Sequence, residues 1–258
     1  MKLGRKPPHP PEHAHHKMRL APYLPAQLPP PPEACSWAGA VSEWILGKND
    51  EEGDCAIVAP ANALLCWSSN VGGPVRLEQS AIDAAYTWAG GFDGTPGDES
   101  DGGCVISDVL DGWSTRDVGI GGHRVDAFAE IEHSDHDMIR RAILLFGVAI
   151  VGVELPRAAQ AWGTAPWPSV DGSHGLSGDF APGSWGGHCV ALVGYDVLGV
   201  TAITWGRAVV IPWSTLGCYL TEAWCVVSRD WLSANGVSPS GVDVALMRAD
   251  LAALRDQG

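Results

Sequence analysis

The sequence has no long hydrophobic run and no surplus of positive charge. No apolar stretch approaches the roughly 18 residues that a transmembrane helix needs, and the first residues lack the apolar core of a signal peptide. The formal charge of −14 argues against nucleic acid and anionic membranes as partners, because both are bound through basic faces. We therefore expect a soluble protein without a secretion signal, whose partners are cationic or neutral.

The sequence also lacks paired cysteines. Its seven cysteines include no Cys-x-x-Cys pair, which argues against a disulfide framework or a zinc ribbon and leaves at least one thiol free. Two groups of histidines could bind a metal ion, but the first lies among prolines and the second has no cysteine or carboxylate spacing that completes a ligand set. Neither group predicts a designed metal site. These histidines are His9, His13, His15, His16, His133 and His136. We expect no metal and no cofactor.

Prolines are concentrated near the N-terminus. Ten of the 19 lie between residues 7 and 32, so residues 1–34 should form an extended arm without a packed core. The arm is basic, whereas the rest of the chain is acidic. It could dock on its own domain, dock on a partner or remain solvated. A globular domain over residues 35–230 and a C-terminal extension over 231–258, with a short helix, complete the expected organisation.

The hydrophobic pattern changes within the globular part. Helical spacing comes first and predicts helices over residues 54–69, 77–88, 105–113 and 135–146. Runs of β-branched residues follow and predict strands over 148–154, 188–195, 200–205, 207–211 and 223–227. Helices before strands indicate an α+β protein, with a helical lobe over about residues 35–146 and a β lobe over about 147–230.

The first candidate for chemistry is Cys55, which ends the segment NDEEGDC of residues 49–55. A cysteine that follows a glycine-containing turn at a helix start meets free backbone N–H groups and the helix dipole. Both favour the thiolate, which is the form that attacks carbonyl carbon. The alternative is a small buried cysteine that only fills space.

The second candidate is His188, in the segment GGHCVALVGY of residues 186–195. Two glycines allow close backbone approach, and a histidine that opens an apolar strand is held rigidly at the rim of a sheet. A general base needs such a fixed position. A purely structural histidine is the alternative.

Together these segments resemble the papain-like cysteine peptidases. Asn49, six residues before Cys55, resembles the glutamine that precedes the family's cysteine, and residues 187–195 are similar to its Gly-His-Ala-Val and Val-Gly-Tyr. The segment ITWG of residues 203–206 resembles its Asn-Ser-Trp-Gly. The resemblance covers about residues 32–230. Largely uncharacterised bacterial and phage proteins are similar at Asn-Asp-x-x-Gly-Asp-Cys, Gly-Gly-His and Thr-Trp-Gly.

The resemblance implies a papain-like α+β fold, in which the helical lobe with the nucleophile helix precedes an antiparallel sheet or barrel. It implies a cysteine peptidase or amidase that acts on a peptide or protein substrate. Because the sequence shows no signal peptide or transmembrane segment, we expect the protein in the cytoplasm or in a virion. Cys55 would attack the acyl carbon, and His188 would accept its proton and return it to the leaving group. Asn49 would join the Cys55 N–H in binding the oxyanion, and Trp205 would shield the base.

Two residues depart from the family pattern. The family's histidine-orienting asparagine falls at Ile203, which cannot hydrogen-bond an imidazole, so Thr204 is the nearest replacement unless it is an ordinary strand threonine. Asp54 would raise the thiol pKa unless it turns away to cap the helix, and we expect it to cap. These departures leave room for an inactive binding module, for example a virion component. Acyl transfer to an amine, as in papain-like transglutaminases, is a third possibility.

Overall fold

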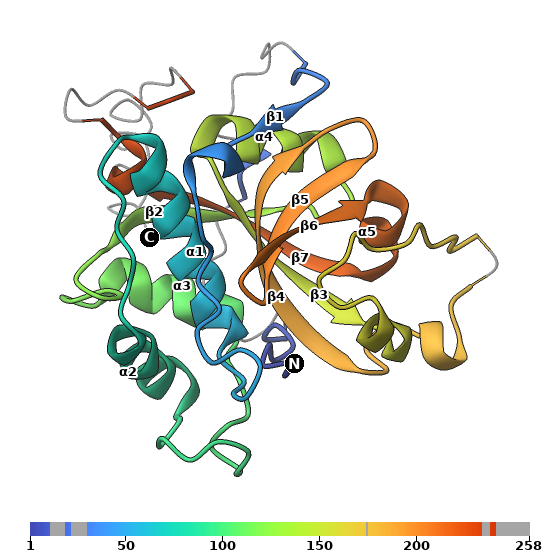
Figure 1. Ribbon diagram of the computed structural model, residues 1–258, viewed down its shortest axis with the longest axis horizontal. Coiled ribbons are helices and arrows are strands. Elements are labelled where there is room, and N and C mark those ends of the chain that lie inside the picture. Colours follow the sequence, from blue (N-terminus) through green and yellow to red (C-terminus); the bar gives the residue numbers. More distant parts are fainter. Residues whose placement is uncertain (11–18, 22–29, 174, 234–237, 241–258) are drawn as a thin grey trace.

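The structure is a computed structural model that describes residues 1–10, 19–21, 30–173, 175–233 and 238–240 (Figure 1). Within these residues, an antiparallel sheet carries helices on both faces. The α-helices are α1 (Cys55–Asn70), α2 (Gln79–Gly90), α3 (Ile106–Thr115), α4 (His136–Phe146) and α5 (Trp213–Tyr219). Most of the C-terminal extension, and the histidines at positions 13, 15 and 16, lie outside the described residues.

The sheet has seven strands in the order β2-β7-β3-β4-β5-β6, with β1 pairing to β4. Every pair is antiparallel, and the α+β class is confirmed. The strands are β1 (Cys35–Ser36), β2 (Val125–Ile131), β3 (Ala149–Leu155), β4 (Gly186–Tyr195), β5 (Gly199–Thr204), β6 (Arg207–Pro212) and β7 (Leu220–Ser228).

Helix α1 lies at the centre of the fold. Fourteen of its 16 residues are buried, which is typical of a helix that is apolar on all sides and enclosed by other elements. It packs on β4, whose Cys189, Ala191 and Val193 belong to the same hydrophobic cluster as α1. The alternate residues Val190 and Leu192 belong to a second cluster with α4. Strand β4 is therefore buried on both faces, and its start is fixed against the start of α1.

The four predicted helices and five predicted strands are present, with ends shifted by a few residues. Among the α-helices and strands of the described residues, three were missed: β1, β2 and α5. Strand β2 alternates between buried and half-buried residues, as a strand with one covered face does, and pairs with β7. Residues before position 146 therefore contribute to the sheet as well as to the helices.

The structure bears on the cysteines, on membrane-spanning helices and on the N-terminal arm. All seven cysteines are free thiols. Across the described ranges, no helix is long and apolar enough to cross a bilayer. The N-terminal residues lie between the start of α1 and β4, next to the two candidate residues for chemistry (Figure 1).

Candidate active site

Cys55 is the first residue of α1 and is completely buried. The backbone amides of Cys189 and Gly4 lie against its sulfur and favour the thiolate. Burial is the stronger influence and raises the pKa of the Cys55 thiol to about 12. In this arrangement the thiol is neutral.

His188 is held from two sides. Its Nε2 lies 2.8 Å from the hydroxyl oxygen of Thr204, at the end of β5. The Trp205 indole stacks on the imidazole with ring centroids 4.5 Å apart and planes at 11°. Its Nδ1 is buried and has no hydrogen-bond partner within the described part of the chain. Burial lowers the pKa of His188 to about 3, so the ring is neutral.

The turn between β5 and β6 explains the position of Trp205. Thr204 pairs with Arg207, so Trp205 and Gly206 form a two-residue hairpin turn. Both have positive φ, 46° and 70°, as the favoured hairpin turns require. A tryptophan in this region is strained, and the stacking on His188 accompanies that strain. The turn thereby places both groups that hold the imidazole.

Cys55 begins α1, and His188 lies near the start of β4, which packs on α1. The residue after His188 contributes a backbone amide that favours the Cys55 thiolate. If Nε2 carries the proton and donates to Thr204, Nδ1 has a free lone pair that can accept a thiol proton. Nucleophilic chemistry at Cys55 with His188 as the general base remains a prediction.

Asn49 is buried in the loop before α1. Its side-chain oxygen Oδ1 has no partner among the residues that the structure describes, whereas its backbone oxygen accepts a bond from the N–H of Lys2 at 3.2 Å. A buried amide oxygen without a partner is rare in folded proteins. An oxyanion would be bound by the other atom of the amide, the donor Nδ2, so the role of Asn49 at the oxyanion remains a prediction.

Asp54 does not cap α1, contrary to the expectation from the sequence. It occupies the N-cap position, but its Oδ2 accepts a bond from the backbone N–H of Lys48 at 3.1 Å instead of a bond from the helix. The loop before α1 turns back on itself, and Asp54 closes that turn. Burial raises the pKa of Asp54 to about 7, and its charge raises the pKa of the neighbouring Cys55.

Buried polar atoms without partners gather around this site. Eight such side-chain atoms occur in the described ranges, and six belong to the site or to the loop before α1. They are Arg5 Nη2, Asn49 Oδ1, Glu52 Oε2, Asp54 Oδ1, His188 Nδ1 and Trp205 Nε1. Such atoms cost free energy, and their clustering is a mark of functional sites.

The sequence analysis missed the residues that fill the site. Residues 2–6 of the arm lie over Cys55, and the Arg5 side chain is buried against Glu154 and Glu222. The sequence did contain a signal for a buried cation, because Glu154 and Glu222 each lie within an apolar strand segment. A carboxylate is rarely buried in a sheet without a partner.

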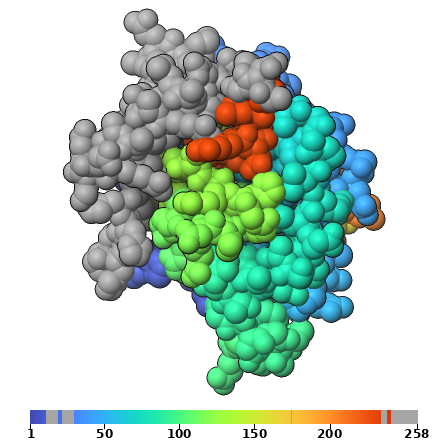
Figure 2. Space-filling view, turned by 90° about the vertical axis from the view of Figure 1, so that its left-hand side faces the viewer, coloured from blue at the N-terminus to red at the C-terminus, as the bar shows by residue number. Residues whose placement is uncertain are grey.

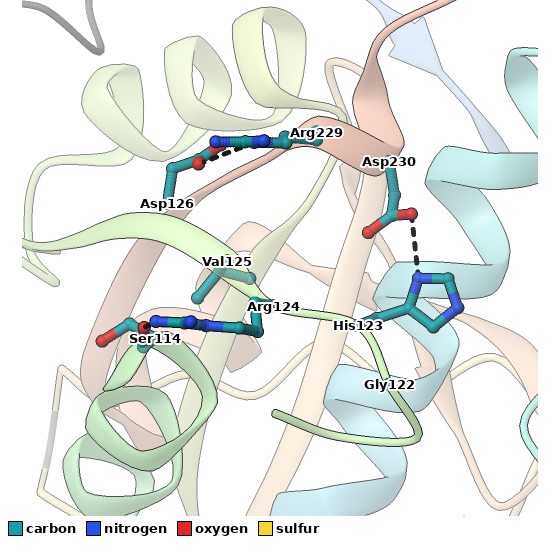
Figure 3. A pocket seen from close by; sticks show the side chains of 8 residues that line it. All are labelled: Ser114, Gly122, His123, Arg124, Val125, Asp126, Arg229 and Asp230. Atoms are coloured by element: carbon teal, nitrogen blue, oxygen red, sulfur yellow. Dashed lines mark hydrogen bonds and ion pairs between the residues drawn. The ribbon is translucent and has the colours of Figure 1, made fainter. Parts of the chain in front are cut away.

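An open pocket of about 450 Å³ lies elsewhere, on the face formed by α3, β2 and the short helix η6 (Arg229–Trp231) (Figures 2 and 3). His123 Nδ1 lies 3.0 Å from Asp230, and Arg229 pairs with Asp126 at 3.1 Å. The pocket lining contains no cysteine, and no cluster of metal-binding side chains occurs among the described residues. It offers ion pairs but no nucleophile.

No family model matches the chain, and no curated protein sequence matches it. Solved structures are similar to it. Xylellain, a cysteine protease from Xylella fastidiosa, is 13% identical with a TM-score of 0.59, over 88% of this chain and 96% of that one. A Carica candamarcensis cysteine protease is 14% identical with a TM-score of 0.52, over 76% and 99%. The ragweed pollen cysteine protease Amb a 11, in its proform, is 13% identical with a TM-score of 0.54, over 79% and 67%.

Likeness at this level of identity shows the fold, and the papain-like fold is confirmed. The roles of Cys55, His188, Asn49 and Thr204 remain predictions. So does the similarity to uncharacterised bacterial and phage proteins.

Proposed function

We propose that the protein is a cysteine-dependent peptidase or amidase. The observation that carries the proposal is the state of His188. Its Nε2 is bonded to Thr204 and its face is covered by Trp205, while its buried Nδ1 has no partner among the residues that the structure describes. A ring held in this way would suit a general base that accepts the proton of the Cys55 thiol. The papain-like fold supports the same class of activity.

In the proposed reaction, the Cys55 thiol gives its proton to His188 Nδ1, and the sulfur attacks the carbonyl carbon of the substrate amide. The Cys55 N–H and the Asn49 amide receive the resulting oxyanion. The tetrahedral intermediate then collapses, the C–N bond breaks, and His188 returns the proton to the leaving amine. Water, activated by His188, hydrolyses the thioester and releases the acid and the free thiol.

Burial sets the resting state of the pair. It is the first cause of both pKa shifts, the rise at Cys55 and the fall at His188. Removing the residues that cover the site would let water reach both groups and move both pKa values back towards their ordinary range. We infer that the covered form is dormant.

The proposal is tested by cleavage of fluorescently labelled casein, with and without a thiol-reactive epoxide whose adduct is mapped by mass spectrometry. In a Gly4→Ala background, where the N-terminal segment cannot cover the site, we expect Cys55→Ala to lower the cleavage rate by a factor of at least about 10³. The matched control is Cys66→Ala, because Cys66 is a buried cysteine on the same helix and should leave cleavage within about twofold. Equal loss in both variants, or an epoxide adduct spread evenly over the seven thiols, would refute the assignment.

An inactive binding module is the second candidate. Two features favour this alternative, because both oppose formation of the thiolate. Cys55 is completely buried, and the Asp54 carboxylate lies beside it without capping the helix. A Cys55→Ala variant that retains every measurable property of the parent, including partner binding, would support it. Acyl transfer on the same site remains open, and we would detect it as amine incorporation into casein.

A further inference from the structure

Residues 2–6 cross the candidate nucleophile and bond to both sides of the site. The helical side provides carbonyl oxygens in the loop before α1 and before α3, and the sheet side provides one at the start of β4. Three backbone N–H groups of the segment donate to these oxygens: Lys2 to Asn49 at 3.2 Å, Lys6 to Cys104 at 2.8 Å and Arg5 to Gly187 at 3.1 Å. The segment is therefore seated by its backbone on both walls.

Glycine at position 4 makes this close approach possible. A Cβ on Gly4 would collide with the carbonyl oxygen of Gly53. The N–H of Gly4 faces the Cys55 sulfur, while its carbonyl oxygen accepts a bond from Cys104 at 2.8 Å. A cysteine nucleophile attacks carbonyl carbon, whereas the Cys55 sulfur here meets an N–H group. The segment blocks the site in an arrangement that does not present its own amide for cleavage.

The Arg5 side chain enters a pocket next to Cys55. Its side chain is completely buried, its Nε donates to Glu222 at 2.6 Å and its Nη1 donates to Glu154 at 2.6 Å. The two carboxylates accept from two different nitrogens of one planar group. Arginine offers donors in this fixed arrangement, whereas the single ammonium group of lysine does not.

The pocket is shaped for this group. Gly152 of β3 forms its floor, and a Cβ there would collide with Arg5 Nε. Glu222 is nearly fully buried, and its second oxygen accepts a bond from the Trp224 indole N–H at 3.0 Å, which fixes the carboxylate. A buried carboxylate is costly unless it is paired, so the pocket favours a cation and disfavours neutral or acidic side chains.

We propose that the pocket formed by Gly152, Glu154 and Glu222 is a recognition site for an arginine side chain of a bound peptide, and that Arg5 occupies it in the resting protein. The proposal deepens the proposed function and rests on it for one point, that the peptide is a substrate. A substrate would place this arginine next in sequence to the residue that faces Cys55. The acidic charge of the protein is consistent with a basic peptide.

The test uses the full chain with the segment displaced, as the double variant Gly4→Ala/Arg5→Ala, also carrying Cys55→Ala to prevent turnover. Two probes are compared by calorimetry: the acetylated and amidated peptide Lys-Leu-Gly-Arg-Lys, and the same peptide with citrulline in place of arginine. Citrulline keeps the shape and removes the charge. We expect the arginine peptide to bind at least tenfold more tightly, and adding Glu222→Gln to reduce that difference to less than threefold.

Gly73→Ala, also with Cys55→Ala, is the matched control, because a Cβ at Gly73 meets nothing within 4 Å and the segment stays in place. It should bind neither peptide. Equal binding of both peptides to the displaced variant, or no binding by a variant whose circular dichroism shows it folded, would overturn the proposal. Binding does not need the Cys55 thiol, so an unreactive Cys55 with selective arginine binding would refute only the peptidase.

A second measurement applies if the displaced variant does not fold. Glu154→Gln changes one partly exposed carboxylate and leaves the core intact. We expect amide hydrogen exchange of residues 2–6 to become at least fivefold faster in this variant, because Arg5 loses an ionic partner. Exchange at the parental rate would contradict the role of the pocket.

Discussion

The covered site at Cys55 and the open pocket at His123 differ in how their polar groups are satisfied. In the open pocket, His123 and Arg229 pair with nearby carboxylates and remain partly exposed to water. At Cys55, several buried polar atoms have no partner within the described ranges, and residues 2–6 fill the space above them. Exposed ion pairs call for no further explanation, whereas buried polar atoms without protein partners do. The difference points to the covered site as the functional one.

The largest expected effect comes from uncovering the site. In Gly4→Ala the segment cannot approach Gly53, so Cys55 becomes accessible to water and reagents. We expect iodoacetamide to alkylate Cys55 at least about 100-fold faster than in the parent, as measured by mass spectrometry of the digested protein. In Gly73→Ala, Cys55 should be alkylated at the parental rate. A similar acceleration in both variants would show that the substitutions loosen the whole fold instead of uncovering the site.

The next effect separates Thr204 from an ordinary strand threonine. Thr204→Val keeps the shape and removes the hydroxyl that bonds to His188 at 2.8 Å. We expect casein cleavage in the uncovered Gly4→Ala background to fall about tenfold, which corresponds to one hydrogen bond of about 1.4 kcal/mol. Thr201→Val, on the same strand but partly exposed, should change cleavage less than twofold. Equal rates in the two variants would remove Thr204 from the site.

The acidic residue beside Cys55 gives a test in pH. The folded pKa of Asp54, about 7, lies above its unfolded value, so the native state binds the proton more tightly. Stability from this group is full below about pH 4 and is lost as the pH rises through about 7. We expect the free energy of unfolding in urea to fall by about 2–4 kcal/mol over that range through this group.

The matched variants for this test are Asp54→Asn and Asp50→Asn. Asp54→Asn should flatten the fall in stability, because asparagine does not titrate, whereas Asp50 is exposed and should leave it unchanged. Identical pH profiles for Asp54→Asn and the parent would mean that the burial of Asp54 does not control its titration.

The smallest effect is expected at the open pocket. His123→Ala removes a partly exposed partner of Asp230, and such surface pairs contribute about 0–1 kcal/mol. We expect casein cleavage by the Gly4→Ala protein to stay within about twofold when His123 is also replaced. A loss as large as that of Thr204→Val would move the functional site to the open pocket and reverse the comparison.

Local patterns in the sequence predicted the parts of the site that lie on regular elements. The turn before Cys55 and the apolar strand after His188 each predict the start of one element, and the structure places those starts together. Thr204 was found through its spacing from the Trp-Gly turn, and the structure places its hydroxyl on the imidazole. These residues were accessible because helix and strand periodicity reports on neighbouring positions.

The docking of the arm could not be predicted. Arg5 meets Glu154 and Glu222 across 149 and 217 residues of sequence, and a proline-rich segment has no periodicity that reports such contacts. The role of Asp54 was mistaken for a related reason, because the N-cap pattern does not reveal that Lys48 turns back and competes for the carboxylate. Long-range packing decided both cases.

The most direct test of the account is the pH dependence of Cys55 alkylation by iodoacetamide in the uncovered Gly4→Ala protein. If His188 activates the thiol, the rate should reach its plateau through an apparent pKa well below the ordinary thiol value of about 8.5, and His188→Gln should return that pKa to about 8.5 or above. A rate that rises only above about pH 8.5, with or without His188, would contradict the account.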